Sequence, residues 1–205
     1  MDLQYIVIEG VIGVGKTTLA EMVAERLNAR KVLEQPEENP FLEDFYKNPR
    51  QYAFQTQLFF LLSRYRQQQA IPQRDLFHQR IISDYIFAKD KIFAYLNLED
   101  RELQLYEKII GLLEKDITRP DLVVYLKSQP LRLLENIKLR DRSYERAMSR
   151  EYIESLNEAY NNFFSHYNDS SLLIVDTTHL DFVQRHEDFE YLIAQIENFE
   201  HKCGV

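Results

Sequence analysis

The sequence predicts an α/β fold, in which a five-stranded parallel sheet carries helices on both faces. Two observations support this prediction. Short apolar runs alternate along the 205 residues with longer segments of helical periodicity, the order of elements that builds a parallel sheet. The first apolar run leads directly into a glycine-rich loop, and a helical pattern begins where that loop ends. Strands covered on both faces are apolar almost throughout, as these runs are.

The individual elements follow from the spacing of apolar residues. Leu19, Val23 and Leu27 mark one face of the first helix, and 51–70 is predicted to be a long helix because it has no breaker and an aromatic face. A segment rich in proline and acidic residues lies between these helices and predicts a loop with a short helix. The predicted strands are 5–8, 31–34, 79–84, 122–126 and 172–176. The later predicted helices are 86–96, 99–117, 131–140, 150–167 and a last helix through 196.

The composition argues against several classes of protein. With 33 acidic and 25 basic residues the net charge is −8, which is not expected of a protein that binds long nucleic acid. The only cysteine, Cys203, excludes an internal disulfide framework. Because neither a signal sequence nor an apolar run of membrane-spanning length is present, we expect a cytoplasmic protein without a membrane partner. Since no linker or repeat divides the chain, we expect one domain over 1–205.

The glycine-rich loop has the form G-x-x-x-x-G-K-T and predicts a phosphate-binding P-loop. The chain has only five glycines, and three of them lie here. Such a loop turns several backbone N–H groups toward one anion, and the following helix N-terminus adds positive potential. Lys16 is expected to reach the β- and γ-phosphates, and the Thr17 hydroxyl to ligate Mg²⁺. The predicted nucleotide-binding residues are Gly10, Gly13, Val14, Gly15, Lys16, Thr17 and Thr18.

Polar residues follow several of the predicted strands. Glu34 ends the second strand, Asp84 the third and Asp176 the last. Because the carboxyl ends of parallel strands meet at one edge of the sheet, where ligands bind in such folds, we expect these side chains to lie beside the P-loop.

Several blocks of the chain, in order, resemble the deoxynucleoside kinase family, and most closely its bacterial deoxyadenosine/deoxyguanosine kinase branch. The blocks are IEGVIGVGKTT, ENPFLEDFYKNPRQYAFQTQLFFLLSR, PDLVVYLKSQP and RDRSYE, and the similarity extends from Tyr5 to about Phe182. The resemblance implies a P-loop kinase fold, a homodimer, and transfer of the γ-phosphoryl group of ATP to the 5′-hydroxyl of a deoxynucleoside. It implies Mg²⁺ as cofactor and a purine substrate, with deoxyadenosine favoured.

The resemblance also implies roles on the acceptor side. Glu34 matches the family carboxylate that orients the 5′-hydroxyl and accepts its proton, although it stands in a stretch that also contains Glu37 and Glu38. Gln55 matches the glutamine that reads the base, and Gln57 is the alternative because residues two apart cannot face one ligand from a helix. The remaining predicted substrate contacts are Phe93 against the base, or alternatively in the core, and Tyr46 and Glu145 at the sugar 3′-hydroxyl.

The segment 132–150 carries six basic and three acidic residues and resembles the mobile lid that closes over the phosphates. Guanidinium groups fit phosphoryl oxygens and stabilise transition-state charge. We therefore predict Arg140 and Arg142 to be catalytic together with Lys16 and Glu34. The alternative is an ordinary solvated helix face.

The sequence departs from the family pattern at Ser83-Asp84-Tyr85, where many members carry an acidic residue, arginine and serine. One interpretation is that Asp84 supplies the carboxylate near Mg²⁺. The other is that Asp84 contacts the substrate directly, and that the task of the arginine passes to Arg80 or to a lid arginine.

Two other functions remain compatible with the sequence. A nucleoside monophosphate kinase, such as a thymidylate kinase, would need a second cationic site for the acceptor phosphate. A relative without activity, serving as a structural or regulatory subunit, is suggested by the altered segment at 83–85. The intact P-loop, Glu34 and the paired arginines favour the deoxynucleoside kinase.

Overall fold

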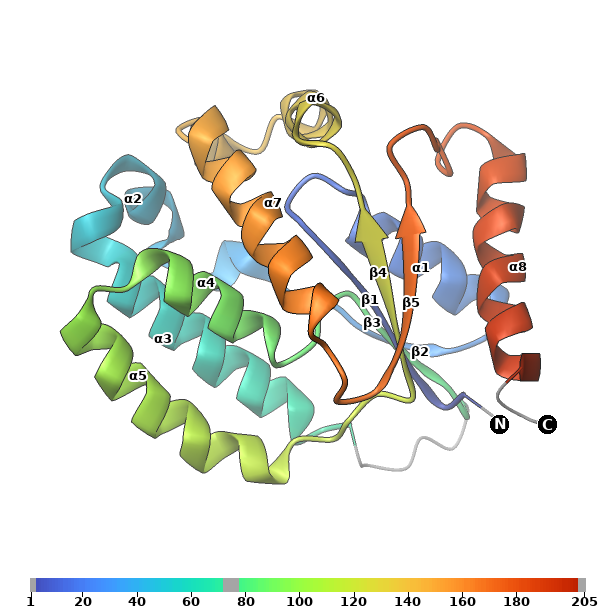
Figure 1. Ribbon diagram of the computed structural model, residues 1–205, viewed down its shortest axis with the longest axis horizontal. Helices are drawn as coiled ribbons and strands as arrows, with labels where there is room; N and C mark the ends of the chain where they lie inside the picture. Colours follow the sequence, from blue (N-terminus) through green and yellow to red (C-terminus); the bar gives the residue numbers. More distant parts are fainter. Residues whose placement is uncertain (1–2, 72–77, 203–205) are drawn as a thin grey trace.

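The computed structural model describes residues 3–71 and 78–202, and its centre is one parallel sheet (Figure 1). The strand order is β2-β3-β1-β4-β5, and every neighbouring pair is parallel. The predicted α/β sheet of five parallel strands is confirmed. The strands are β1 (Tyr5–Gly10), β2 (Arg30–Val32), β3 (Ile81–Ser83), β4 (Leu122–Lys127) and β5 (Ser171–Asp176).

Helices cover both sides of the sheet (Figure 1). Helices α1 (Lys16–Arg26) and α8 (His186–Lys202) lie on one side. Helices α3 (Pro49–Gln68), α4 (Lys89–Asn97), α5 (Asp100–Leu113) and α7 (Arg150–Ser165) lie on the other. The remaining elements are α2 (Leu42–Lys47), α6 (Pro130–Arg140) and the 3₁₀ turns η1 (Pro36–Glu38), η2 (Glu114–Asp116) and η3 (Ser143–Glu145).

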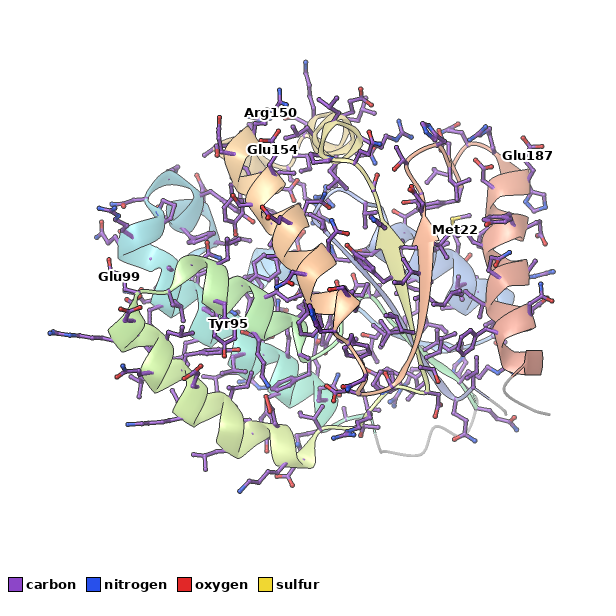
Figure 2. All side chains as sticks on the ribbon, viewed as in Figure 1. Met22, Tyr95, Glu99, Arg150, Glu154 and Glu187 are labelled. Carbon is purple, nitrogen blue, oxygen red and sulfur yellow. The ribbon has the colours of Figure 1, made fainter. Side chains whose placement is uncertain are left out.

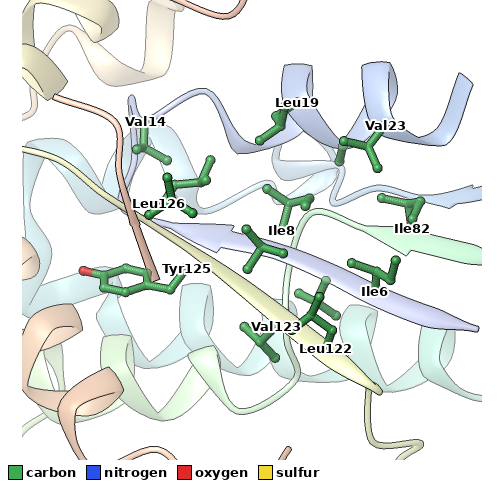
Figure 3. Close-up of a cluster of buried hydrophobic side chains, with 14 of the residues drawn as sticks. Ile6, Ile8, Val14, Leu19, Val23, Ile82, Leu122, Val123, Tyr125 and Leu126 are labelled. Atoms are coloured by element: carbon green, nitrogen blue, oxygen red, sulfur yellow. The ribbon is translucent and has the colours of Figure 1, made fainter. Parts of the chain in front are cut away.

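The main core lies between the central strands and the helices that cover them. All six residues of β1 are buried, and Leu19 and Val23 of α1 pack toward Ile8 and Ile82 (Figure 3). On the opposite face, Tyr125 of β4 stacks on Phe164 of α7 with ring centroids 4.2 Å apart. Burial of these apolar side chains is the main stabilising contribution and holds the strand ends in fixed positions.

The helical layer has a second apolar cluster of its own. Leu61 of α3, Ala94 of α4, and Tyr106 and Ile110 of α5 are buried against one another, with Phe87 beside them. The aromatic face predicted for 51–70 therefore packs mainly on other helices. Helices α3 and α5 lie beside α4, and this group of helices reaches beyond the edge of the sheet (Figure 1).

Element boundaries differ from the prediction at the sheet edge. Strand β2 pairs only with β3 and ends at Val32, two residues before Glu34, which was predicted to end the strand. Because an edge strand has one partner, it ends where that partner ends, and β3 is only three residues long. Glu34 is therefore free to turn from the sheet toward other side chains.

Candidate active site

The P-loop connects β1 to α1 and has the backbone geometry of an anion site. Gly13 and Gly15 have φ angles of 89° and 94°, a region that side-chain-bearing residues rarely adopt. Gly15 caps α1, and the N–H groups of the first turn, from Lys16 onward, have no acceptor within the helix. A Cβ atom on Gly15 would lie 2.8 Å from the Phe182 ring, so the loop and the segment after β5 are in close contact.

Asp84 connects the P-loop to the segment after β2. Its Oδ2 accepts a hydrogen bond from Thr17 Oγ1 at 2.5 Å, and its Oδ1 accepts one from the Glu34 backbone N–H at 2.8 Å. Burial, and then the negative charge of Glu34, raise the pKa of Asp84. The expected meeting of strand-end carboxylates beside the P-loop is thus present for Glu34 and Asp84. Asp176, which was expected there too, is exposed, accepts a hydrogen bond from the Thr178 backbone N–H and lines neither cavity beside the loop.

Glu34 is held by two cations. Its Oε1 lies 2.6 Å from Arg64 Nη2, and its Oε2 accepts a hydrogen bond from Lys89 Nζ at 2.9 Å. Burial raises the pKa of Glu34, but attraction by Arg64 and Lys89 outweighs burial, so the net pKa lies well below its ordinary value. The carboxylate is ionised at neutral pH.

Arg64 also belongs to a buried polar network. Its Nη1 pairs with Asp90, which is fully buried and accepts a hydrogen bond from Tyr106 at 3.2 Å. Gln57 donates from Nε2 to the Asp90 carboxylate and, at 2.9 Å, to the Asp90 carbonyl oxygen. Burial raises the pKa of Asp90 although Arg64 opposes this. The network fixes Arg64 and the side-chain orientation of Gln57.

Two further charged groups lie beside the P-loop. Burial, and then repulsion by Lys89, lower the pKa of Lys16 to about 8. Glu9 is fully buried and accepts hydrogen bonds from the Gly10 and Ile86 backbone N–H groups at 2.8 and 3.0 Å. Glu9 therefore ties the start of the P-loop to the segment that follows Asp84.

Two cavities adjoin the P-loop, one on each side. The first, the acceptor cavity, is lined by Lys16, Thr17 and residues after β2 and β3. The second, the donor cavity, is lined by Gly13, Val14, Gly15 and Thr18 and by the segment after β5 from Thr177 to Gln184. Arg140 lines both cavities. The P-loop thus lies between two cavities, and Arg140 is a lining residue of both.

The acceptor cavity brings together most of the residues predicted from the sequence: Lys16, Thr17, Glu34, Tyr46, Asp84, Phe93, Arg140, Arg142 and Glu145. Gln55 is the exception, because its side chain is exposed on α3 and it does not line the cavity. Gln57 is buried and does line it. The structure thus places Gln57, the alternative, at the cavity and the preferred Gln55 outside it, because the packing of α3 turns position 57 inward and position 55 outward.

The predicted lid divides into an inner and an outer part. Arg140 pairs with the buried Glu145 through Nη2 at 2.5 Å, and Arg142 Nη1 lies 2.6 Å from the Tyr144 hydroxyl and 3.4 Å from Glu37. By contrast, Arg150 pairs with Glu154 on the exposed start of α7 (Figure 2). Arg140 and Arg142 line the acceptor cavity and Arg132 lines the donor cavity. Arg146 and Arg150 instead pair with carboxylates at exposed positions.

Sequence reasoning missed Arg64, Lys89 and Asp90. A signal was present, since Arg64 stands within the aromatic face of 51–70, and Lys89 and Asp90 directly follow the apolar run Tyr85-Ile86-Phe87-Ala88. Charged residues at positions that periodicity predicts to be buried are seldom left without a partner. Arg80, considered for the task of the family arginine, precedes β3 and lies at the amino-terminal edge of the sheet, opposite the P-loop.

A parallel sheet, a P-loop between two cavities, and a carboxylate and cations facing that loop define a P-loop kinase. Within 3–71 and 78–202, no helix has the length and apolarity needed to cross a membrane. Comparison with known proteins identifies the family.

Residues 6–201 match the family model described as deoxynucleoside kinase. The chain is 35% identical over 198 residues to a deoxyguanosine kinase of Bacillus subtilis (strain 168), covering 94% of this chain and 96% of the relative. It is 40% identical over 162 residues to a deoxyadenosine kinase of Dictyostelium discoideum, covering 78% of this chain and 66% of the relative. A solved structure of deoxyadenosine kinase from M. mycoides with bound dATP superposes with a TM-score of 0.81 at 26% identity, covering 95% of this chain and 99% of that chain.

The chain therefore belongs to the deoxynucleoside kinase family. It is an enzyme, a phosphotransferase of deoxynucleoside salvage, and it uses a nucleotide as phosphate donor. The resemblance stated from the sequence is confirmed. Because these relatives are named as deoxynucleoside kinases, the alternatives of a nucleoside monophosphate kinase and of an inactive subunit are disfavoured.

Proposed function

We propose that the enzyme transfers the γ-phosphoryl group of ATP to the 5′-hydroxyl of a purine deoxynucleoside, with deoxyadenosine preferred. The observation that carries this proposal is the position of the P-loop between the donor and acceptor cavities, which share Arg140. A triphosphate bound to the P-loop would have its nucleoside in the donor cavity and its γ-phosphate at the acceptor cavity. Phosphoryl transfer depends mainly on such positioning and on charge neutralisation.

On the donor side, the backbone N–H groups of the P-loop and the Lys16 ammonium bind the phosphates. The Thr17 hydroxyl and the Asp84 carboxylate lie 2.5 Å apart and offer the hard oxygen ligands that Mg²⁺ prefers. Mg²⁺, which commonly takes one or two protein ligands together with phosphate oxygens, fits this pair and would neutralise phosphate charge. We assign Asp84 to this carboxylate role, because its contact is to the P-loop threonine.

On the acceptor side, the 5′-oxygen attacks the γ-phosphorus in line. A new O–P bond forms, and the bond between the γ-phosphorus and the β,γ-bridging oxygen breaks with its electron pair leaving on ADP. The hydroxyl proton passes to the Glu34 carboxylate. Glu34 is a weak base because Arg64 and Lys89 stabilise its charge, so its main contribution is to orient the hydroxyl. Arg140 and Arg142 neutralise charge on the phosphoryl oxygens.

The orientation of Gln57 supports the proposed preference for deoxyadenosine. Both of its hydrogen-bonding contacts within the described residues use Nε2, and they go to Asp90. Its Oε1 is left as an acceptor at the cavity. The exocyclic amino group of adenine can donate to this oxygen, whereas the O6 carbonyl of guanine would meet it with a second acceptor. Phe93, Tyr46 and Glu145 line the same cavity. We assign Phe93 to the contact with the base, and Tyr46 and Glu145 to the contact with the sugar 3′-hydroxyl.

An assay with ATP and Mg²⁺ on deoxyadenosine, deoxyguanosine, deoxycytidine, thymidine and dAMP tests the proposal. We expect the highest kcat/KM with deoxyadenosine, no turnover of dAMP, and loss of turnover in Lys16→Ala. Gln57→Leu should lower kcat/KM for deoxyadenosine by about 10²-fold or more, since a buried polar contact is lost. The matched variant Gln55→Leu should stay within about twofold, because Gln55 is exposed. Lack of turnover of every deoxynucleoside would refute the reaction, and a larger effect at Gln55 would refute the base assignment.

A further inference from the structure

Lys89 occupies a position where a lysine is locally unfavourable. It is the first residue of α4 and only 2% exposed. A cation at a helix N-terminus is opposed by the helix dipole, and a buried ammonium loses its hydration at a cost of several kcal/mol. Residues that break local preferences in this way occur at functional sites.

The contacts of Lys89 differ from those of Arg64, the other cation bound to Glu34. Arg64 directs Nε and Nη2 at Glu34 and Nη1 at Asp90, so its guanidinium is held between two carboxylates. Within the described residues, Lys89 Nζ has one ion-pair partner, Glu34 Oε2 at 2.9 Å. An ammonium group has three N–H donors. Two of them are therefore available in the acceptor cavity, which Lys89 lines.

The ammonium group of Lys89 lies beside the place where the proposed reaction would occur, because it contacts Glu34 in the acceptor cavity. A hydroxyl that donates to a Glu34 oxygen lies about 3 Å from that oxygen and hence beside Lys89 Nζ. Lys16, on the opposite P-loop side, lines the same cavity. Ser83-Asp84-Tyr85 supplies no cation here, and Arg80 lies at the far edge of the sheet.

We propose that Lys89 is a catalytic residue whose ammonium group donates to the acceptor 5′-oxygen and the incoming phosphoryl group as the O–P bond forms. This inference rests on the proposed reaction. Negative charge on these oxygens is stabilised by a donor that is already in place and shielded from water. The proton still passes to Glu34, and Lys89 remains protonated throughout.

Steady-state kinetics of Lys89→Met, Lys89→Gln and Lys89→Arg, with ATP and deoxyadenosine, test the proposal. We expect Met and Gln to lower kcat about 10²- to 10³-fold, the usual effect of removing one transition-state donor, while KM for deoxyadenosine changes less than about threefold. Because arginine keeps the positive charge, kcat of Lys89→Arg should be at least about tenfold higher than that of Lys89→Met or Lys89→Gln. The control is Lys91→Met, two residues further along α4, where the lysine pairs with Glu114 outside the acceptor cavity. It should stay within about twofold.

The alternative is that Lys89 only holds Glu34 in place, and a double-mutant cycle decides between the two roles. If Lys89 contacts the reacting atoms, Lys89→Gln should still lower single-turnover rates at least about tenfold in a Glu34→Gln background. Absence of that additional loss, or kcat unchanged in both Lys89→Met and Lys89→Gln, would overturn the proposal. Thermal unfolding checks that each variant is folded. If Lys89→Met does not fold, the kinetics of Lys89→Gln alone test the proposal. Turnover by the unmodified enzyme in the same assay tests the reaction separately from Lys89.

Discussion

At the scale of single residues, the carboxylate of Glu34 is distinguished from the neighbouring acids by its partners. Arg64 and Lys89 hold it at the acceptor cavity, whereas Glu38 is exposed. The sequence left open which of the acidic residues between positions 34 and 38 lies at the cavity beside the P-loop. The tertiary contacts show that Glu34 does. The same contacts control its ionisation.

Glu34→Gln should lower kcat by about 10²- to 10⁴-fold, because the hydroxyl loses its charged acceptor, while Glu38→Gln should have little effect. Since the pKa of Glu34 is lowered in the folded enzyme, protonation of Glu34 should not reduce kcat until the pH falls below the ordinary value of about 4.3. The stabilisation linked to this group is present above that value and is lost as the pH falls through the lowered pKa. A kcat–pH profile tests the first point, and denaturant unfolding at a series of pH values tests the second. An acid limb of kcat near pH 6 that vanishes in Glu34→Gln would contradict the lowered pKa.

Lys16 is expected to take up a proton when the donor binds. Its pKa of about 8 in the unliganded enzyme should rise when phosphate charge approaches, so ATP binding near pH 8.5 is accompanied by proton uptake. Affinity should fall by up to about tenfold per pH unit above pH 8. Calorimetry in two buffers of different ionisation enthalpy gives the number of protons. Lys16→Arg, which stays charged, should bind without uptake, and equal uptake in that variant would assign the proton to another group.

At the scale of elements, the site is assembled where segments remote in the sequence are tied together at the carboxyl ends of the strands. Asp84 joins the P-loop to the segment after β2, and Glu9 joins the P-loop to the start of the α4 segment. Arg142 and Tyr144 of the lid contact Glu37 in η1. Each tie joins residues at or just beyond the ends of strands and helices, as Glu9 lies in β1, Thr17 in α1 and Glu37 in η1. The packed sheet and helices therefore determine where these groups meet.

The P-loop and α5 provide a matched pair of glycines. Gly15→Ala should lower the free energy of unfolding by about 1–3 kcal/mol, because φ is 94° and the new Cβ would lie 2.8 Å from Phe182. Gly111→Ala should instead raise it by about 0.5–1 kcal/mol, since Gly111 lies within α5 and its Cβ meets open space. Denaturant unfolding of both variants measures the difference. A Gly15→Ala variant as stable as the parent enzyme would contradict the strained geometry.

At the scale of the whole molecule, we propose that the helical layer opposite α1 and α8 forms the contact of a homodimer. Leu62 of α3 and Tyr95 of α4 are 50% and 60% exposed, and Leu105 and Leu112 of α5 are 49% and 70% exposed. Figure 2 places Tyr95 on this layer. Exposed apolar residues on one layer are typical of surfaces that associate.

Analytical ultracentrifugation at micromolar concentration should give about twice the chain mass of 24.6 kDa. Tyr95→Lys should shift the protein toward the monomer, because a charge is placed in an apolar contact. Tyr191→Lys on α8, where the tyrosine is 48% exposed on the other side of the sheet, is the control and should leave the mass unchanged. A monomeric parent protein, or dissociation by the α8 variant alone, would argue against this surface.

The sequence by itself determined the parallel sheet and the P-loop, because these depend on local patterns: apolar periodicity, glycine spacing and a strand–loop–helix order. The reaction class was implied by the resemblance of whole sequence blocks to the deoxynucleoside kinase family. Only the tertiary structure decided that Gln57 rather than Gln55 lines the cavity, since the inward face of α3 depends on which helices pack against it. It also brought Arg64 and Lys89 to Glu34 from positions 30 and 55 residues away. No local pattern carries such pairings, because the attraction between buried charges depends on distance in space and not on separation along the chain.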